Sequence, residues 1–133
     1  RIRVAADFKM PNGIAGTPDG KTLYVADIND NKIYGYDIQP DGSLPNRRLV
    51  CNYGSDGMTL DNQGHFYLSA NIRGVAGVSI VEIKTGKLVG FVPVPQQPAN
   101  MAFGGKNHDQ LFMTARTGFY MIPTKVKGAN PAK

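Results

Sequence analysis

An internal repeat of 44 residues is the feature that most constrains the fold of this 133-residue chain. Three segments of similar pattern begin with a short polar residue, at Asn12, Asp56 and Asn100, and these positions are spaced by 44 and 44 residues. After each of them come an apolar stretch, a polar turn or loop, and a second apolar stretch. A fixed period of this length indicates a repeat architecture.

Each repeat has the pattern of a series of short strands. The apolar stretches are rich in β-branched and aromatic residues and are bounded by Gly, Asn, Asp and Pro. No segment shows the 3.6-residue apolar period of an amphipathic helix, so we expect almost no helix. The predicted strands are 12–16, 22–26, 32–38 and 47–51 in the first repeat, 56–60, 65–69, 77–83 and 87–93 in the second, and 100–104, 110–115 and 118–123 in the third.

A four-stranded unit of about 44 residues is typical of a β-propeller blade. We therefore predict an all-β chain of three four-stranded blades at approximately 10–52, 54–95 and 96–127, with a tail at 128–133. Alternating apolar residues at 2–6 predict an extra outer strand within 1–8 that closes another blade. Propellers have about 4–8 blades, so three blades are expected to form half of a six-bladed ring that a second chain completes. An open three-unit sheet or sandwich is the alternative.

The repeated polar residues are the first candidates for a site. In a propeller the innermost strand of each blade starts near the central channel, so Asn12, Asp56 and Asn100 are expected to face a shared cavity. Their oxygen donors suit a divalent cation, with calcium, magnesium or manganese favoured and zinc possible. The alternative is turn chemistry, because Asn-Gly and Asp-Gly are common turn dipeptides, as Asp19-Gly20 and Asp41-Gly42 are expected to be.

Other polar residues are weaker candidates. Asp27, Asn71 and Arg116 stand near the ends of the second strands and are possible channel-lining residues, although a surface role is the simpler interpretation. His65 and His108 have no partner at metal-ligand spacing, so a histidine base is not expected. Cys51 is interpreted as a small buried hydrophobe.

Composition excludes several classes of function. The formal charge of +5 and the pI of about 9.4 suit an anionic partner, but Arg47-Arg48 is the only adjacent basic pair, so no nucleic-acid partner is expected. No apolar run approaches the roughly 18 residues of a membrane span, and no leader is evident, so any export signal is absent or already removed. The single cysteine excludes an intrachain disulfide and leaves a cytoplasmic, periplasmic or secreted location open.

Several motifs together resemble one known family. They are Met10-Pro-Asn-Gly-Ile-Ala, Thr17-Pro-Asp-Gly-Lys-Thr-Leu-Tyr-Val-Ala-Asp27, Asp41-Gly-Ser-Leu, Asp56-Gly-Met-Thr and Ala102-Phe-Gly-Gly-Lys-Asn107. From residue 3 to about residue 127 the chain resembles the C-terminal half of the six-bladed propeller of the gluconolactonase/regucalcin (senescence marker protein) family.

The resemblance implies a function for two of the repeated residues. Asn12 matches the family's metal-ligating asparagine, and Asp56 matches its metal-ligating aspartate, which is also assigned the role of general base. Asn100 occupies the corresponding place in the last blade, which the family does not use consistently as a ligand. The family's activity is hydrolysis of sugar-acid lactones with a divalent cation in the channel.

One departure from the family pattern bears on activity. The family's glutamate ligand lies in a Glu-Gly-Pro motif that this chain lacks, and its single glutamate, Glu82, lies in an outer-strand context. The favoured hypothesis is metal-dependent lactone hydrolysis by a metal-bound water with Asp56 as ligand and general base, in a homodimer or with a complementing half-propeller. The alternative is a non-catalytic propeller module, for binding or assembly, that has lost the lactonase site.

Overall fold

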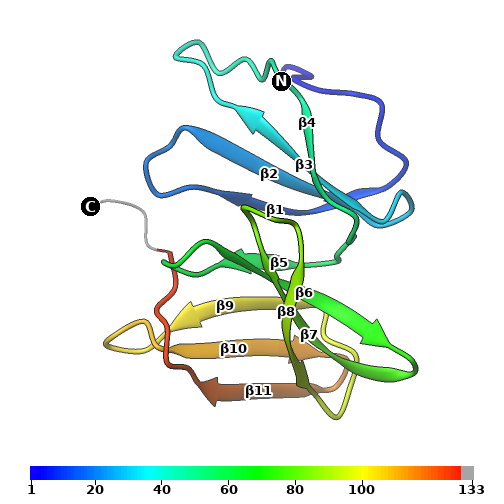
Figure 1. Ribbon diagram of the computed structural model, residues 1–133, viewed down its shortest axis with the longest axis vertical. Coiled ribbons are helices and arrows are strands. Elements are labelled where there is room, and N and C mark those ends of the chain that lie inside the picture. Colours follow the sequence, from blue (N-terminus) through cyan, green and yellow to red (C-terminus); the bar gives the residue numbers. More distant parts are fainter. Residues whose placement is uncertain (130–133) are drawn as a thin grey trace.

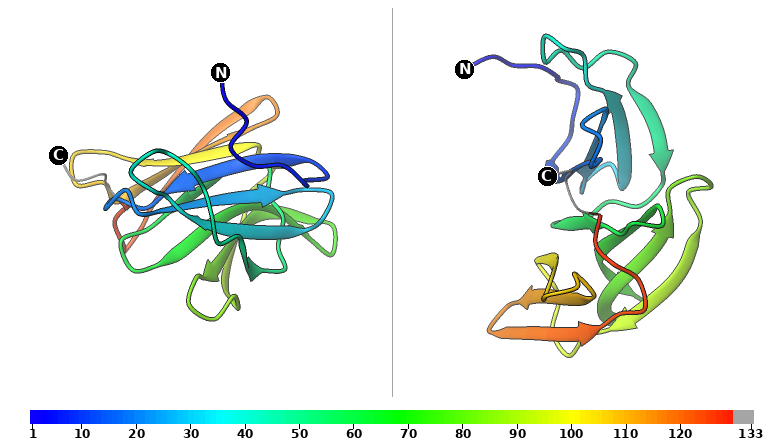
Figure 2. Two further views of the ribbon diagram at one scale, coloured as in Figure 1. Left: turned by 90° about the horizontal axis from the view of Figure 1, so that it is seen from above. Right: turned by 90° about the vertical axis from the view of Figure 1, so that its left-hand side faces the viewer.

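The computed structural model describes residues 1–129, and these residues form eleven strands in three antiparallel sheets without a helix (Figure 1). The sheets follow one another in chain order and lie side by side along an arc (Figure 2). The predicted fold class, an all-β chain of propeller blades, is confirmed. Within the described residues there is no helix long and apolar enough to cross a membrane.

The first sheet is a four-stranded meander in which each strand pairs with the next. Its connections use left-handed residues at Gly20 (φ 71°), Asn31 (φ 51°) and Gly42 (φ 83°), so both Asp-Gly turns lie where the sequence predicts them. The strands are β1 (Pro11–Gly16), β2 (Thr22–Asp27), β3 (Lys32–Asp37) and β4 (Arg48–Cys51).

The second sheet is also a four-stranded meander, but its central hairpin is longer than predicted. Arg73 (φ 50°) and Gly74 (φ 84°) form a two-residue turn of the left-handed kind that suits the twist of a hairpin. The predicted strand ended at residue 69 because Asn71 is polar, whereas the observed strand continues to Ile72. The strands are β5 (Met58–Leu60), β6 (His65–Ile72), β7 (Val75–Glu82) and β8 (Leu88–Pro93).

The third sheet has three strands among the described residues, as the third repeat predicts. They are β9 (Asn100–Gly104), β10 (Gln110–Ala115) and β11 (Gly118–Pro123), with β10 in the centre. Strands β1, β5 and β9, each the first in its repeat, lie at an edge of their sheets, and β5 contacts both β1 and β9, so these three are the innermost strands.

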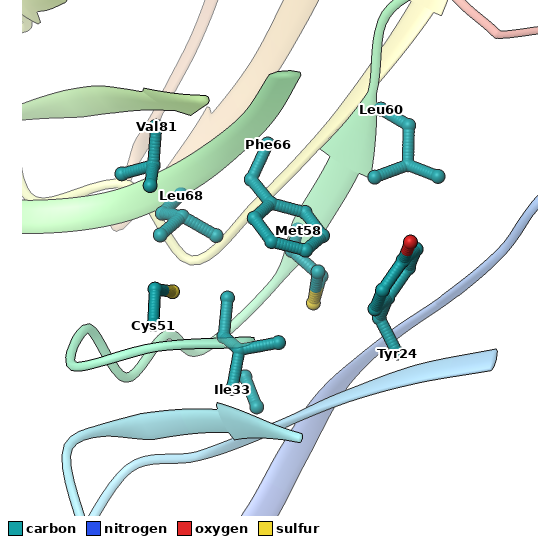
Figure 3. Packing of buried hydrophobic residues seen from close by; sticks show 9 residues of the cluster. Tyr24, Ile33, Cys51, Met58, Leu60, Phe66, Leu68 and Val81 are labelled. Atoms are coloured by element: carbon teal, nitrogen blue, oxygen red, sulfur yellow. The ribbon is translucent and has the colours of Figure 1, made fainter. Parts of the chain in front are cut away.

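Two hydrophobic cores join the three sheets. Strand β6 contributes to both, because successive side chains of a strand point to opposite faces. Phe66 packs edge-on against Tyr24 of the first sheet (ring centroids 4.9 Å apart), and Tyr67 packs edge-on against Phe103 of the third (5.1 Å). Figure 3 shows the first core, formed by Tyr24, Ala26, Ile33, Cys51, Met58, Leu60, Phe66, Leu68 and Val81. The second core consists of Tyr67, Val78, Val94, Met101, Leu111, Met113 and Ala115.

Residues 2–6 differ from the expectation, because the structure assigns no strand to them. A segment forms a β-strand only when it is hydrogen-bonded to a neighbouring strand, and the predicted neighbouring strand of residues 2–6 belongs to another blade. The segment is extended away from the sheets at the N-terminal end (Figure 2). Its pairing to another blade stays a prediction.

The predicted tail is partly anchored. Gly128 forms an isolated bridge with Asp61, and the Ala129 N–H donates to the Leu60 carbonyl oxygen (2.9 Å). Backbone hydrogen bonds thus hold these two residues to the end of β5. The rest of that predicted tail, residues 130–133, lies outside the described residues.

Candidate functional site

The starts of the three innermost strands lie next to one another. Asn12 is exposed in β1, within a bulge that shifts the β1–β2 register between Pro11 and Ile14. Its neighbour Gly13 is so close to the second sheet that an added Cβ would lie 2.7 Å from the Asp56 carbonyl oxygen. Bulges re-aim side chains and are common beside active sites.

The same arrangement recurs between the second and third sheets. The Gly57 N–H donates to the Ala99 carbonyl oxygen (2.7 Å), and an added Cβ on Gly57 would lie 2.6 Å from the Cα of Asn100. Neither Gly13 nor Gly57 has a positive φ, so both glycines serve close approach rather than a left-handed turn. Asp56 and Asn100, like Asn12, are exposed.

Two buried serines hold the segment that carries Asp56. The Ser55 hydroxyl donates to the Gly57 carbonyl oxygen (2.6 Å) and accepts from the Ser69 N–H (2.9 Å). The Ser69 hydroxyl donates to the Pro98 carbonyl oxygen (2.8 Å), two residues before Asn100. These hydrogen bonds couple β5, β6 and the entry to β9, so they set where Asp56 stands.

Asp56 borders a polar hollow of about 310 Å³. Amide side chains from three segments share this hollow with the carboxylate: Asn31, Asn71 and Gln97. It adjoins a second hollow of about 280 Å³, which is also lined by Asn31 and Asn71. The arrangement presents one carboxylate among amide donors and acceptors, a composition suited to a hydroxylated ligand.

Asp27 has a different role from the one its position predicts. Its side chain is buried (1% exposed), and its carboxylate accepts from the N–H groups of Lys9 (2.7 Å), Met10 (2.9 Å) and Asp30 (3.1 Å). Burial raises the pKa of the Asp27 carboxyl, but these donors outweigh that effect and hold the pKa below its ordinary value. Asp27 therefore anchors the chain entering β1 and does not line an open surface.

The other two possible channel-lining residues lie in different settings. Asn71 borders the hollow beside Asp56, while its Oδ1 accepts from the Gly74 N–H (2.9 Å) of the hairpin turn. Arg116 is exposed and left-handed (φ 48°) in the turn between β10 and β11. Among the described residues, the hollow at Asp56 does not include Arg116.

His65 has a partner that the sequence analysis missed. Its Nδ1 lies 2.9 Å from Oδ2 of the buried Asp61, which also accepts from the Tyr67 hydroxyl (3.3 Å). Burial, together with the Asp61 carboxylate, raises the pKa of the Tyr67 hydroxyl. This cluster lies at the opposite end of β6 from Ser69 and Asn71, so it braces the turn before β6 and takes no part in the site at Asp56.

The donor set at the strand starts is compatible with a hard cation but incomplete. Amide oxygens of Asn12 and Asn100 and the carboxylate of Asp56 are ligand types that calcium, magnesium and manganese accept. Among residues 1–129 no group of three or more His, Cys, Asp or Glu side chains is placed to hold a metal ion. Glu82 lies in β7, where its carboxylate accepts from the Thr85 hydroxyl (2.6 Å). The side chains of Asn12, Asp56 and Asn100 would supply fewer oxygen atoms than the roughly six to eight that calcium takes.

Several residues of the site carried only a weak sequence signal. Ser55 directly precedes Asp56, but the spacing of residues along the chain does not reveal that the Ser55 hydroxyl accepts from the Ser69 N–H. Asn31 and Gln97 lie in connections between strands, outside the repeated motif. Of these residues only Asn71 was indicated, because it stands near the end of the predicted second strand of its repeat.

Comparison with known proteins gives a consistent family assignment. The family model described as "SMP-30/Gluconolactonase/LRE-like region" matches residues 2–117. A gluconolactonase from Zymomonas mobilis is 27% identical over 139 residues, which cover 94% of this chain and 38% of that protein. The chain spans less than half the length of the curated relatives it matches.

Solved structures agree with this assignment. A gluconolactonase from Xanthomonas campestris is 31% identical with a TM-score of 0.74, and the match covers 89% of this chain and 39% of that one. A calcium-binding regucalcin from Agrobacterium tumefaciens shares the fold, with 23% identity, a TM-score of 0.76 and coverage of 96% of this chain and 49% of that one. The match to the family model covers most of the sequence, so the chain belongs to the SMP-30/gluconolactonase/LRE-like family.

Proposed function

We propose that this chain is half of a propeller that hydrolyses sugar-acid lactones, with Asp56 as the general base. The observation that carries the proposal is that Asp56, next to the starts of β1 and β9, borders a polar hollow, which Asn12 and Asn100 do not line. Lactonase names among the relatives support the reaction class. We further propose that the ring is completed by a second half, either another copy of this chain or a complementing half-propeller.

The residues of this chain would divide the chemistry as follows. Asn12 and Asp56 would hold a divalent cation, most suitably calcium, with Asn100 as a further oxygen donor. When bound, such a cation supplies Lewis-acid polarisation of the lactone carbonyl. The Asp56 carboxylate accepts a proton from the attacking water, and Ser55 and Ser69 keep the backbone of Asp56 in place. Asn31, Asn71 and Gln97 offer amide groups to the hydroxyls of a sugar acid.

Lactone hydrolysis by the assembled protein tests the proposal. Gluconolactone opening is followed by acid release, corrected for spontaneous hydrolysis, with calcium and then with EDTA. Asp56→Asn keeps the shape and an oxygen donor but loses the base, so we expect the rate to fall about a hundredfold or more. Asp41→Asn, which makes the same charge change in a distant turn, should keep the full rate. Full activity in Asp56→Asn contradicts the assigned role.

One observation favours the alternative of a non-catalytic propeller module for binding or assembly. Asp56 is the only carboxylate bordering the hollow among the described residues, and Glu82 is held elsewhere by Thr85. In that case hydrolysis stays at the background rate and is unaffected by EDTA, even in preparations whose mass shows a complete ring. Chelator-sensitive hydrolysis above background excludes this alternative.

A further inference from the structure

The hollow of about 280 Å³ beside the one at Asp56 is a cleft between the first and second sheets. Its floor belongs to the face of the second sheet that also carries the first core. Leu68 of β6 lies in that core, and Ser79 of β7 is its direct partner in the register, so both side chains point toward the first sheet (Figure 3). Toward the end where Asp56 stands, the floor continues with Ala70 and Ile72. The side chains of Ala70 and Ser79 are small, so the core does not fill this space.

The opposite wall of the cleft is fixed by hydrogen bonds of Asn31. Its Oδ1 accepts from the Gly54 N–H (2.8 Å), and its Nδ2 donates to the Asn52 carbonyl oxygen (3.3 Å). These bonds tie the turn after β2 to the connection between β4 and β5, from which Tyr53 lines the cleft. The wall is therefore formed before a ligand binds, and preorganisation of this kind reduces the entropic cost of binding.

Ser79 supplies the observation that points to a ligand. The residue is 3% exposed, and its side chain lies on the face that borders the cleft. Within residues 1–129 its hydroxyl forms no hydrogen bond, whereas the buried hydroxyls of Ser55 and Ser69 each donate to a carbonyl oxygen. Nearly all buried polar groups of native proteins have a hydrogen-bond partner. A hydroxylated ligand in the cleft would provide the partner of Ser79.

The lining of the cleft selects the chemistry of that ligand. No charged side chain of residues 1–129 lines it, so a charged group would be desolvated there without a counter-charge. A purely alkyl group would leave the Ser79 hydroxyl unpaired. Polar groups of Ser79 and Asn71 stand beside the apolar Leu68 and Ile72 and the ring of Tyr53. This combination suits a sugar ring, which has hydroxyl groups at its edge and C–H groups on its faces.

The cleft is continuous with the hollow at Asp56. The residues that line both are Asn31, Gly54, Ser69, Ala70 and Asn71. We propose that the cleft is a subsite for an uncharged glycosyl group, so that the substrates are lactones of glycosylated sugar acids. The lactone part of this inference rests on the proposed function, whereas the glycosyl subsite rests on the cleft alone.

Hydrolysis by the assembled protein compares substrates with and without the glycosyl group. Gluconolactone is measured against the lactones of cellobionic and maltobionic acids, which carry a glucosyl group in two different linkages. We expect kcat/KM for at least one disaccharide lactone to exceed that for gluconolactone by about tenfold or more, because contacts remote from the reacting carbonyl stabilise the transition state. The alkyl-substituted δ-decalactone should show no such preference over gluconolactone.

Two substitutions in the cleft test where the preference arises. Ser79→Ala removes the hydroxyl without adding bulk, and should lower the ratio of kcat/KM for the disaccharide lactone to that for gluconolactone by about threefold to tenfold. Ile72→Trp adds bulk at the cleft and should abolish the preference. The matched controls are Ser43→Ala, in the connection between β3 and β4, and Val89→Trp, on the exposed part of β8. Both should keep the full preference, and unchanged circular dichroism shows that the variants fold.

Binding of the open acids separates the subsite from the reaction. Isothermal titration calorimetry should show that cellobionate or maltobionate binds more tightly than gluconate, and that Ile72→Trp removes the difference. Tighter binding of a disaccharide acid without lactone hydrolysis upholds the subsite and refutes only the proposed reaction. Equal binding of the acids with no preference in hydrolysis overturns the inference. A preference that Ser79→Ala and Ile72→Trp both leave intact, or a stronger preference for δ-decalactone, also overturns it.

Discussion

At the scale of single residues, Asp27 shows how one buried carboxylate positions the candidate site. Its carboxylate accepts hydrogen bonds from three backbone N–H groups: those of Lys9 and Met10 in the segment entering β1, and that of Asp30 in the turn after β2. That entry leads through Met10 into the bulge that carries Asn12. The Asn12 side chain is thus placed by a carboxylate in a neighbouring strand.

Stability should depend on pH through Asp27. Its pKa is lowered in the folded state, so its contribution is complete above the unfolded pKa of about 3.9 and is lost as pH falls through the folded pKa. Asp27→Asn should lower the free energy of unfolding by roughly 2 kcal/mol at neutral pH, because charged acceptors bind N–H groups more strongly. The difference from wild type should shrink as pH falls below about 4.

Urea denaturation at several pH values measures this effect. Asp109→Asn, which makes the same charge change in the loop between β9 and β10, is the matched control and should change the free energy of unfolding at neutral pH by no more than about 0.5 kcal/mol. A difference between wild type and Asp27→Asn that stays constant from neutral pH to pH 3 would contradict the role assigned to the carboxylate.

At the scale of the elements, the separation of the innermost strands depends on two glycines. Gly13 faces the Asp56 carbonyl oxygen and Gly57 faces the backbone of Asn100, at distances that no Cβ can accept. The glycines of the Asn12-Gly13 and Asp56-Gly57 pairs therefore allow neighbouring sheets to approach each other closely. Asn100 is followed by Met101 instead, because that side chain points into the second core.

Adding a methyl group at Gly57 should push β5 and β9 apart. We expect Gly57→Ala to lower the free energy of unfolding by about 1–3 kcal/mol, as overpacking does. Gly16→Ala is the matched control, because its added Cβ would lie 3.8 Å from the Thr22 carbonyl oxygen, and its effect should be within about 0.5 kcal/mol. Equal effects of the two substitutions in urea denaturation would refute the close-approach explanation.

At the scale of the whole molecule, the middle sheet makes the three sheets one cooperative body. Strand β6 sends Phe66 into the first core and Tyr67 into the second, so neither core persists if the middle sheet unfolds. The middle of β6, from Phe66 to Ser69, is buried without a break for the same reason: both of its faces are covered.

Substitutions in the two cores should therefore have similar consequences. Phe66→Ala in the first core and Leu111→Ala in the second should each lower the free energy of unfolding by about 2–5 kcal/mol. Unfolding should remain a single transition, with circular dichroism and tyrosine fluorescence coinciding at one fixed protein concentration. A variant that unfolds in two steps would show that the cores are independent.

Most of the strands could be predicted because each is a local pattern. Alternation and bounding turn residues placed 100–104, 110–115 and 118–123 at the bounds that the structure shows. The hairpin turn at Arg73-Gly74 was missed because Asn71, Arg73 and Gly74 together resemble a loop in the sequence, although Ile72 and Val75 pair beside the turn. The strand at 2–6 was not formed because alternation alone does not provide a neighbour.

The 44-residue period determined the repeat, the all-β class and the alignment of Asn12, Asp56 and Asn100, because those depend on side-chain type at fixed spacing. Contacts between distant segments depended on tertiary structure. The close approach of β1, β5 and β9 explained Gly13 and Gly57, and the segment entering β1 folded over Asp27 and supplied two of its hydrogen-bond donors. Spacing along the chain carries no information on which residue fills which space, because burial and hydrogen bonding are properties of neighbours that meet only when the sheets pack.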